Sequence, residues 1–307
     1  MTLTAIILTK NEELHIERCL SSLRSVCDEM LVVDSYSTDQ TVRLAQQAGA
    51  RVVQHAWTNP AAQFNYALTQ CGVQSDWVWR VDADEYVEEA LGKAVRDLIM
   101  HADSELTGLY VRRRIDFMGR PLRHGGWYPR YTLKVFRRGH GMCEQRWQDE
   151  HIRLTDGRTM RVSAGDQVDA NLNGLTWWTE KHNRYATYEM LDLLMTELGM
   201  DCSKQQVQPR LMGSAEERKR WLKVKYARMP LFIRPFLNHW YRYFIRLGFL
   251  DGGTGFVWHI LQGFWYRMLV DAKIFELKRA NDWDRERIRQ AVQQLTEQLE
   301  KSSVSRI

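Results

Sequence analysis

The sequence predicts an α/β fold, in which a mostly parallel sheet flanked by helices is followed by a C-terminal helical region. Three observations lead to this prediction. Short apolar runs alternate with amphipathic stretches through roughly the first hundred residues, several of the runs end in polar clusters, and the end of the chain mixes aromatic, apolar and basic residues. Strands and helices alternating in this way form βαβ units, whose ligands bind beyond the carboxyl ends of the strands.

The first part of the chain supplies the parallel units. The pattern predicts strands at 3–9, 30–35, 51–57 and 76–82, and helices at 12–25, 41–49, 61–71 and 88–100. Mixed or antiparallel strands are then expected within 107–123, 131–139, 149–154 and 159–164, before a long helix at 176–197. Because residues 198–213 are polar and irregular, we expect a catalytic domain at 1–213, with halves 1–105 and 106–213, and a separate region at 214–307.

The composition places the chain among soluble, core-forming proteins. Its 307 residues are 44% hydrophobic and 26% charged, which suits one large or two modest domains. The start, MTLTAIILTKNEE, lacks the basic segment of a signal peptide. The five cysteines show no C-x-x-C spacing, which argues against a disulfide framework or a zinc site and favours a reducing cytoplasm.

The C-terminal region is basic and aromatic. Residues 218–246 hold nine Lys or Arg and no Asp or Glu, although the whole chain has a net charge of only +5. The uncharged stretch 252–266 has 15 residues, fewer than the roughly 20 of a membrane-spanning helix. We therefore expect membrane contact through interfacial or re-entrant helices. The alternatives are a helical subdomain packed on the core and binding of single-stranded nucleic acid.

The stretch WVWRVDADEYVEE, residues 77–89, carries the densest acidic cluster. Asp82 and Asp84 can share a face where the strand ends, and two such carboxylates can hold Mg²⁺ or Mn²⁺. A metal there would bridge a diphosphate. The alternative is that these acids only begin the next helix, an interpretation we keep for Glu85, Glu88 and Glu89.

Two other predicted strands end in polar clusters. VVDSYSTDQT follows the second strand with Asp34, and TKNEE follows the first with Thr9, Asn11 and Glu12. Asp39 suits the N-cap of helix 41–49, whereas Asp34 lies too early for that role. An exposed carboxylate at Asp34 would accept N–H groups of a base or ribose hydroxyls. Three polar clusters at one edge of a sheet predict a ligand site there.

At this point the sequence resembles a known family. AIILTKNEE, MLVVDSYSTDQT, RVVQHAW, QFNYAL and DWVWRVDADE, in this order, look like the GT-A nucleotide-sugar domain of glycosyltransferase family 2. The resemblance covers about residues 2–155 and is strongest to the branch containing the bacterial lipopolysaccharide core β-glucosyltransferases. The segment YFIRLGFLDGGTGFVWHILQGFWYRMLVDAKIFE is similar to tails of enzymes that build cell-surface polysaccharides on lipid carriers.

The resemblance implies a role for each matching position on the donor side. Thr9, Asn11 and Glu12 would line the nucleotide pocket, Asp34 would face the uracil, and Arg51 would approach the base or ribose. Gln63 and Asn65 would approach the diphosphate and metal. Asp82 would contact the ribose or the metal, and Asp84 would bind the metal directly.

The family inverts the anomeric centre, which implies one carboxylate base for the acceptor hydroxyl. WQDEHIRL offers Glu150, which we rank first, and Asp149. Members of this branch often carry His-Glu here, whereas this chain has Asp-Glu-His, so the choice between the two acids stays open. An acidic turn before a strand is the alternative. His151 is a further candidate metal ligand, although a lone histidine is more often structural.

HGGWYPRYTLKVFRR, residues 124–138, is the candidate acceptor-side loop. Its two glycines permit a flexible loop, Trp127 and Tyr128 offer flat faces for a sugar, and arginines could neutralise phosphate. The arginines are Arg130, Arg137 and Arg138. The alternative is a strand edge with solvated arginines.

These features together predict a metal-dependent inverting glycosyltransferase using Mn²⁺ or Mg²⁺. It would move a hexose from a nucleotide-sugar, with UDP as the expected carrier, to a lipid-linked saccharide in lipopolysaccharide, O-antigen or capsule synthesis. It would be peripheral at the cytoplasmic face of the bacterial inner membrane and would bind no nucleic acid.

Three other functions would account for part of these features. One is an enzyme acting directly on a polyprenyl phosphate, and another is a phosphatase, whose acidic motif should follow the first strand rather than the fourth. A non-enzymatic protein that binds nucleic acid or another anionic surface leaves the polar strand ends unexplained.

Overall fold

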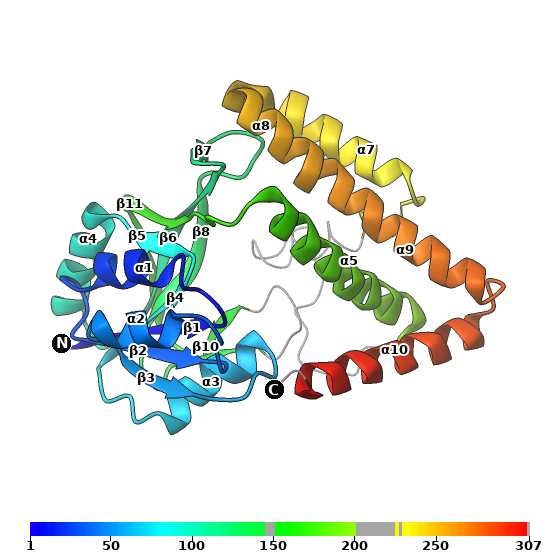
Figure 1. The fold of residues 1–307 in the computed structure, drawn as a ribbon. Helices are drawn as coiled ribbons and strands as arrows, with labels where there is room; N and C mark the ends of the chain where they lie inside the picture. The colour runs from blue at the N-terminus through cyan, green and yellow to red at the C-terminus, as the bar shows by residue number, and fades with distance from the viewer. Residues whose placement is uncertain (145–150, 201–224, 227–228, 306–307) are drawn as a thin grey trace. The chain divides into compact units, whose positions relative to one another are not determined.

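A computed structural model describes residues 1–144, 151–200, 225–226 and 229–305 (Figure 1). The chain forms two compact units, one built on Met1–Asn173 and the other on Gly174–Ser302. This division falls after Asn173, whereas the expected boundary at residue 213 lies outside the described residues. The long helix α5 (Leu175–Leu198) buries Met190 and Leu194 against residues of the C-terminal helices, so it belongs to the second unit.

The first unit is built on a nine-stranded mixed sheet. The strand order is β3-β2-β1-β4-β8-β6-β11-β5, with β7 beside β6. The strands are β1 (Leu3–Thr9), β2 (Glu29–Asp34), β3 (Arg51–Gln54), β4 (Trp77–Asp82), β5 (Glu85–Val87), β6 (Leu106–Phe117), β7 (Arg120–Leu122), β8 (Arg130–Arg137) and β11 (Arg158–Asp169). β9 (Gly141–Cys143) and β10 (Ile152–Leu154) form a separate antiparallel pair.

The direction of the strands divides this sheet into two parts. β3, β2, β1 and β4 run parallel to one another, which confirms the predicted βαβ units. β8 is antiparallel to both β4 and β6, and β5 is antiparallel to β11. β11 runs parallel to β6. The first hundred residues therefore supply the four parallel strands together with β5, and the later residues add strands of mixed direction, as the change of pattern after residue 100 predicts.

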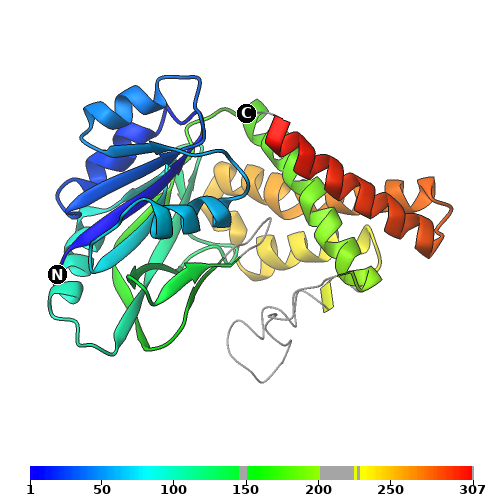
Figure 2. The ribbon, with the colours of Figure 1, turned by 90° about the horizontal axis from the view of Figure 1, so that it is seen from below.

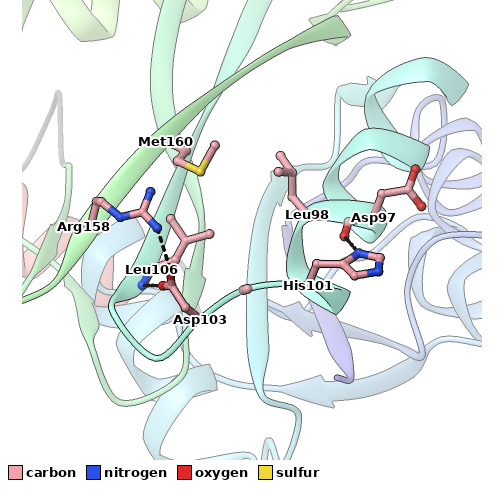
Figure 3. Close-up of a pocket in the computed structure, with 8 residues that line it drawn as sticks. Asp97, Leu98, His101, Asp103, Leu106, Arg158 and Met160 are labelled. Carbon is pink, nitrogen blue, oxygen red and sulfur yellow. Dashed lines mark hydrogen bonds and ion pairs between the residues drawn. The ribbon is translucent and has the colours of Figure 1, made fainter.

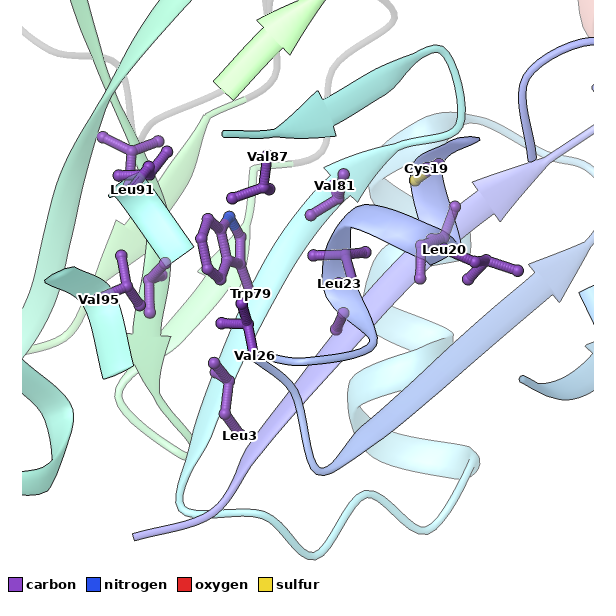
Figure 4. Packing of buried hydrophobic residues seen from close by; sticks show 14 of the residues in the cluster. Leu3, Cys19, Leu20, Leu23, Val26, Trp79, Val81, Val87, Leu91 and Val95 are labelled. Atoms are coloured by element: carbon purple, nitrogen blue, oxygen red, sulfur yellow. The ribbon is translucent and has the colours of Figure 1, made fainter. Parts of the chain in front are cut away.

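Helices cover both faces of the parallel part (Figures 1 and 2). They are α1 (Ile16–Leu23), α2 (Thr41–Gln47), α3 (Pro60–Gln70) and α4 (Glu89–Met100). Alternate residues of β1 point to opposite faces: Ile7 joins a core with Leu20 of α1, whereas Ile6 joins a second core with Phe64 of α3. In the first core Trp79 of β4 packs among side chains of α1 and α4 (Figure 4).

Two short strands, β5 and β9, have no counterpart in the prediction. Each has three residues, too few for a period of two to appear in the sequence. β5 changes the interpretation of the acidic cluster, because Glu85 begins this strand rather than a helix. Glu88 precedes α4 without capping it through its side chain, and only Glu89 lies in the first turn of that helix.

The second unit is helical. Besides α5 it contains α7 (Ile233–Trp240), which continues into the π-helical turn Tyr241–Ile245, a 3₁₀ turn (Gly248–Asp251) and α10 (Arg285–Ser305). α8 (Gly252–Trp258), the π-helical segment His259–Trp265 and α9 (Tyr266–Ala280) follow one another without a break. The uncharged stretch 252–266 is thus the first half of a longer helix. Among the described residues, no helix has the length and apolar character needed to cross a membrane.

Candidate active site

The three predicted polar clusters lie at the same edge of the sheet. Thr9 at the end of β1 is in register with Asp34 at the end of β2, and Leu8 is in register with Asp82 at the end of β4. Parallel pairing therefore brings together polar residues that are separated by up to 73 positions in the chain. This edge is the one at which the ligands of parallel sheets bind.

Asp34 is buried rather than exposed. Its carboxylate accepts hydrogen bonds from Thr9 Oγ1 (2.9 Å) and from both the main-chain N (2.8 Å) and the Oγ (2.5 Å) of Ser37. Gln54 Nε2 donates a further, longer bond of 3.3 Å. The expectation of an exposed carboxylate is thus corrected, because the turn after β2 folds back over Asp34.

The loops after β1 and β2 are held together by reciprocal hydrogen bonds. Asn11 Oδ1 accepts from the main-chain N of Thr38 (2.9 Å), and Ser37 Oγ accepts from the main-chain N of Asn11 (2.8 Å). The main-chain N of Glu12 donates to Thr41 Oγ1 at 2.7 Å. Asn11 has a φ of +56°, a left-handed conformation that asparagine tolerates well. The two loops therefore form one connected rim.

Gln63 and Asn65 of α3 make structural contacts. Buried Gln63 donates from Nε2 to Ser35 Oγ (2.8 Å) and to the main-chain O of His55 (2.9 Å). Asn65 exchanges two bonds of 2.9 Å with the main chain of Cys143 in β9. Gln63 therefore supports the rim after β2, whereas Asn65 ties α3 to the small antiparallel pair.

The structure does not bring Arg51 to this edge. Arg51 is in register with Leu31, near the start of β2, and its guanidinium binds Glu29 (2.8 Å) and the main-chain O of Cys71 (2.9 Å). Gln54 and His55 follow at the other end of the same strand and do lie beside Asp34 and Gln63. The position expected of Arg51 is corrected because β3 runs parallel to β2, so its first residue lies at the far edge.

Asp82 lies among cations supplied by the protein. Lys134 Nζ, from the antiparallel strand β8, is 3.3 Å from Asp82 Oδ2, and Arg80 Nε is 3.6 Å from Oδ1. Burial alone would raise the pKa of Asp82, but the charges of Lys134, Arg80 and Arg113 outweigh it and hold this pKa well below its usual range. Asp82 is therefore ionised, and protein cations already offset the repulsion that the acidic stretch would otherwise create.

Glu85 is a site residue that the sequence reasoning assigned to a helix start. It is fully buried and accepts from Lys134 Nζ (3.0 Å), Gln167 Nε2 (2.5 Å) and Arg113 Nε (3.1 Å). It also accepts from the main-chain N of Asp82 at 3.1 Å, which fixes the turn of the acidic stretch. Its partners come from β6, β8 and β11, so no local pattern could have revealed them.

Asp84 is half-buried, and Asn171 Nδ2 donates to its Oδ2 at 3.0 Å. Its main-chain O accepts from Arg18 Nη2 and from the main-chain N of Ala170, both at 3.1 Å. In the described part of the chain, no three His, Cys, Asp or Glu side chains are arranged to hold a metal. Mg²⁺ is commonly bound by only one or two carboxylates together with substrate phosphates, so Asp84 with Asp82 nearby fits such an ion.

His15 connects the rim to this region. It is buried at the start of α1, with Nδ1 2.7 Å from Glu12 Oε2 and Nε2 2.9 Å from the main-chain N of Leu172. Because an amide N–H can only donate, Nε2 is the acceptor and Nδ1 carries the proton. Glu12 is thereby linked through His15 to the residue that follows Asn171. The sequence offered only a lone histidine, four residues after Asn11.

The candidate acceptor-side loop is attached to β11 through Asp166. Tyr128 Oη donates to Asp166 at 3.1 Å, and Arg112 Nε and Arg114 Nη1 reach the same carboxylate at 2.5 and 3.1 Å. Trp127, which precedes Tyr128 in this loop, is half-buried. Gly125 and Gly126 have φ angles of +71° and +74°, which glycine adopts without strain.

The arginines of residues 124–138 lie at different edges of the sheet. Arg130 begins β8 and is in register with Arg113, close to the site. Arg137 ends β8 opposite Trp77 and donates to the main-chain O atoms of Asp103 (2.8 Å) and Leu106. The acceptor-side position expected of Arg137 is corrected because β8 runs antiparallel to β4, so the end of β8 and Arg138 after it lie at the far edge.

Two expected residues cannot be placed. Asp149 and Glu150, the candidate bases, lie outside the described residues. The described chain resumes at His151, whose main-chain O accepts from the main-chain N of Glu144 at 2.9 Å.

A pocket at the far edge of the sheet is separate from this site (Figure 3). It lies between α4 and the starts of β6 and β11, and an ion pair of 2.9 Å between Arg158 and Asp103 lies at its rim. None of the residues predicted for donor, metal or acceptor lines it.

Comparisons with known proteins identify a family. Residues 4–160 match the sequence profile described as Glycosyl transferase family 2. Over 281 residues, the chain is 27% identical to the lipopolysaccharide core biosynthesis glycosyltransferase LpsC of Rhizobium meliloti, covering 90% of this chain and 93% of that protein.

Two further matches cover less of the chain. An uncharacterised glycosyltransferase of Rickettsia bellii is 43% identical over 89 residues, 29% of this chain, and the match spans only 30% of that relative's length. A structure of Mycobacterium tuberculosis glucosyl-3-phosphoglycerate synthase with Mn²⁺, UDP and glucosyl-3-phosphoglycerate matches with a TM-score of 0.32 and 21% identity, over 37% of this chain and 44% of that one.

Proposed function

The chain belongs to glycosyltransferase family 2, and on this premise we propose that it is a metal-dependent, inverting hexosyltransferase. It would transfer a hexose from a nucleotide-sugar, with UDP as the carrier, to a lipid-linked saccharide in lipopolysaccharide, O-antigen or capsule synthesis. The similarity along most of the chain to a lipopolysaccharide core glycosyltransferase supports this acceptor class. We place the enzyme at the cytoplasmic face of the inner membrane, as a peripheral protein.

The observation that carries the proposal is the pair Asp82 and Asp84 at the carboxyl edge of β4. The two side chains differ in their surroundings: Asp82 faces Lys134 and Arg80, whereas Asp84 accepts a neutral donor, Asn171. This difference supports Asp84 as the direct metal ligand and Asp82 as a neighbour that orients the ribose or completes the metal site. A bound Mn²⁺ or Mg²⁺ would neutralise the charge that develops on the departing diphosphate.

The rim built by the loops after β1 and β2 would bind the nucleoside. Thr9, Asn11 and Glu12 fix one side of the rim, and Asp34 fixes the other. For Asp34 to face the uracil directly, its bonds to Ser37 would have to open. Closed as they are, they would instead hold the rim in shape while its main-chain groups contact the base.

Chemistry on the acceptor side needs one base. Glu150, or Asp149 beside it, would take the proton of the acceptor hydroxyl while that oxygen attacks the anomeric carbon in line. The bond from the anomeric carbon to the diphosphate oxygen breaks, and the nucleoside diphosphate leaves with the electron pair. Tyr128 and Trp127 would offer faces to the acceptor sugar, with Tyr128 held in place by Asp166.

Donor hydrolysis tests the proposal without knowledge of the acceptor. Purified protein with Mn²⁺ should be stabilised by at least one member of a UDP-sugar panel in a thermal shift assay and should slowly hydrolyse it. Asp84→Asn should lower hydrolysis about 100-fold. Asp97→Asn, an exposed carboxylate on α4, is the matched control and should change nothing. If no UDP-sugar is bound or hydrolysed, the proposed function is wrong.

A further inference from the structure

We propose that the hairpin made by α7 and α8 inserts its outer face into the headgroup region of an anionic phospholipid leaflet. The outer face consists of Ile233, Phe236, Leu237, Trp240, Tyr241, Phe244 and Ile245. The inference rests on the proposed membrane location and deepens it, since it names the surface that binds and the lipid chemistry that it recognises. Figures 1 and 2 show α7 and the helix of α8 and α9 side by side.

The outer face is a continuous apolar stripe. Its residues recur every three or four positions, which is the spacing of one side of a helix, and all of them are exposed. In the part of the chain that the structure describes, twelve exposed large apolar side chains fall between Phe232 and Phe256. A cluster of this kind marks an interaction surface rather than the scattered apolar residues of an ordinary surface.

The opposite side of α7 is polar and points inward. Asn238 Nδ2 donates to the main-chain O of Gly263 at 2.8 Å, and His239 Nδ1 lies 3.1 Å from the main-chain O of His259. Both acceptors belong to the π-helical segment before α9. These side chains therefore hold the two helices together through hydrogen bonds.

The base of the same hairpin is fastened by a buried ion pair. Arg234 Nε lies 2.7 Å from Asp271 Oδ1, and both side chains are almost fully buried. The other carboxylate oxygen accepts from the main-chain N of Phe232 at 2.8 Å. Buried charged and polar groups thus lie between the helices, together with ring contacts such as Phe236 on Phe264 (4.7 Å between centroids), while the seven side chains of the outer face stay exposed.

This arrangement reverses the pattern of a helix on a water-soluble domain, which turns its apolar side to the core and its polar side to the solvent. It is the arrangement expected where the surroundings are less polar than the interface between the helices. In such surroundings polar side chains face one another or backbone carbonyls.

Charge identifies the occupant as anionic lipid. The chain has no Asp or Glu from Arg218 to Leu250, and Arg246 is exposed at the turn that follows the outer face. Trp240 and Tyr241 are residue types that concentrate at the headgroup level of membranes. A second copy docked on the same face by a two-fold axis would meet the same basic surface, so like charges would oppose that alternative.

Vesicle sedimentation with the full chain tests the inference. Wild-type protein should bind vesicles of phosphatidylglycerol and phosphatidylethanolamine, and Phe236→Ser/Phe244→Ser should weaken this partition about tenfold or more. Met100→Ser/Met118→Ser is the matched control, because these two side chains are equally exposed (50% and 58%, against 58% and 51%) but lie in the first unit. Arg246→Ala should weaken binding to these vesicles about fivefold and should leave binding to pure phosphatidylcholine vesicles unchanged.

Three outcomes would overturn the inference. The wild-type protein could stay in the supernatant, or the serine variants could bind vesicles as well as wild type does. The third outcome is a wild-type protein that is dimeric in lipid-free solution and serine variants that are monomeric. UDP-sugar stabilisation measured on the same preparations separates this inference from the proposed function. Serine variants that still bind the UDP-sugar but no longer bind vesicles support both the inference and the proposed function. Wild-type protein that binds vesicles but no UDP-sugar supports the inference and contradicts the proposed function.

Discussion

The ammonium of Lys134 lies 3.0 Å from Oε2 of Glu85, and both side chains are buried. The same ammonium is 3.3 Å from Asp82. Lys134 belongs to β8, the antiparallel strand inserted between β4 and β6, so this contact joins the parallel part of the sheet to its later additions.

Removing Lys134 should destabilise the first unit. Lys134→Ala leaves the buried carboxylate of Glu85 with one cation fewer, and breaking a buried pair from one side costs about 3–5 kcal/mol. Urea unfolding at pH 7 measures the change, with Lys93→Ala on the exposed side of α4 as the control. Equal stabilities of the two variants would contradict a central role for this contact.

Removing His15 should weaken the donor site. His15→Ala leaves the main-chain N of Leu172 and the carboxylate of Glu12 without their shared partner, and we expect about a tenfold loss in kcat/KM for donor hydrolysis. Asn171→Ala should act on the same connection, so the double variant should lose less than the sum of the two free-energy changes. His101→Ala, on the exposed end of α4, should leave hydrolysis intact. Additive losses would show that His15 and Asn171 act independently.

Gly248 allows close packing in the turn of the hairpin. A Cβ at this position would lie 2.3 Å from His259 Nε2, in a ring that is fully buried. Gly248→Ala should therefore destabilise the second unit by about 1–3 kcal/mol. Gly253→Ala is the matched control: its Cβ meets nothing within 4 Å, and alanine in a helix should be neutral or stabilising by up to about 1 kcal/mol. Thermal unfolding that does not distinguish the two variants would refute this packing.

The second unit should lose stability in mild acid. Burial first, then the charges of Arg242 and His239, lower the pKa of His259 to about 4. The unfolded chain binds a proton at His259 near pH 6.5, whereas the folded unit binds it only near pH 4, so stability falls as the pH falls between these values. Urea midpoints at pH 7 and pH 5 measure the slope. His259→Gln should reduce it and exposed His101→Gln should not; an unchanged slope in the first variant would contradict the prediction.

The parallel half of the fold was predictable because its signals are local. Apolar runs, helical spacing and polar strand ends are readable within a few residues of one another, and they placed Thr9, Asp34 and Asp82 at one edge. The edge at which a single residue lies was harder to predict. Arg51, whose role was implied by the resemblance, begins the parallel strand β3, and Arg137 ends the antiparallel strand β8, so strand direction puts both at the far edge.

The partners of the acidic stretch could not be predicted from the sequence, for a different reason. Asp84 is bonded to Asn171 and Glu85 to Lys134, pairs separated by 87 and 49 positions. No periodicity links such positions, so only the folded sheet reveals that cations lie against the carboxylate of Asp82 while an amide donates to that of Asp84.

The contacts of Arg18 have a consequence for how the protein is made. Its guanidinium binds the main-chain O atoms of Asp84 and Ala170, joining α1 to the acidic turn and to the segment after β11. A growing polypeptide that has left the ribosome only as far as β10 already carries Asp82, Asp84 and Glu85, yet it lacks Gln167, Ala170 and Asn171. The edge that would bind a donor is therefore completed only after the last strand of the sheet and Asn171 behind it have emerged.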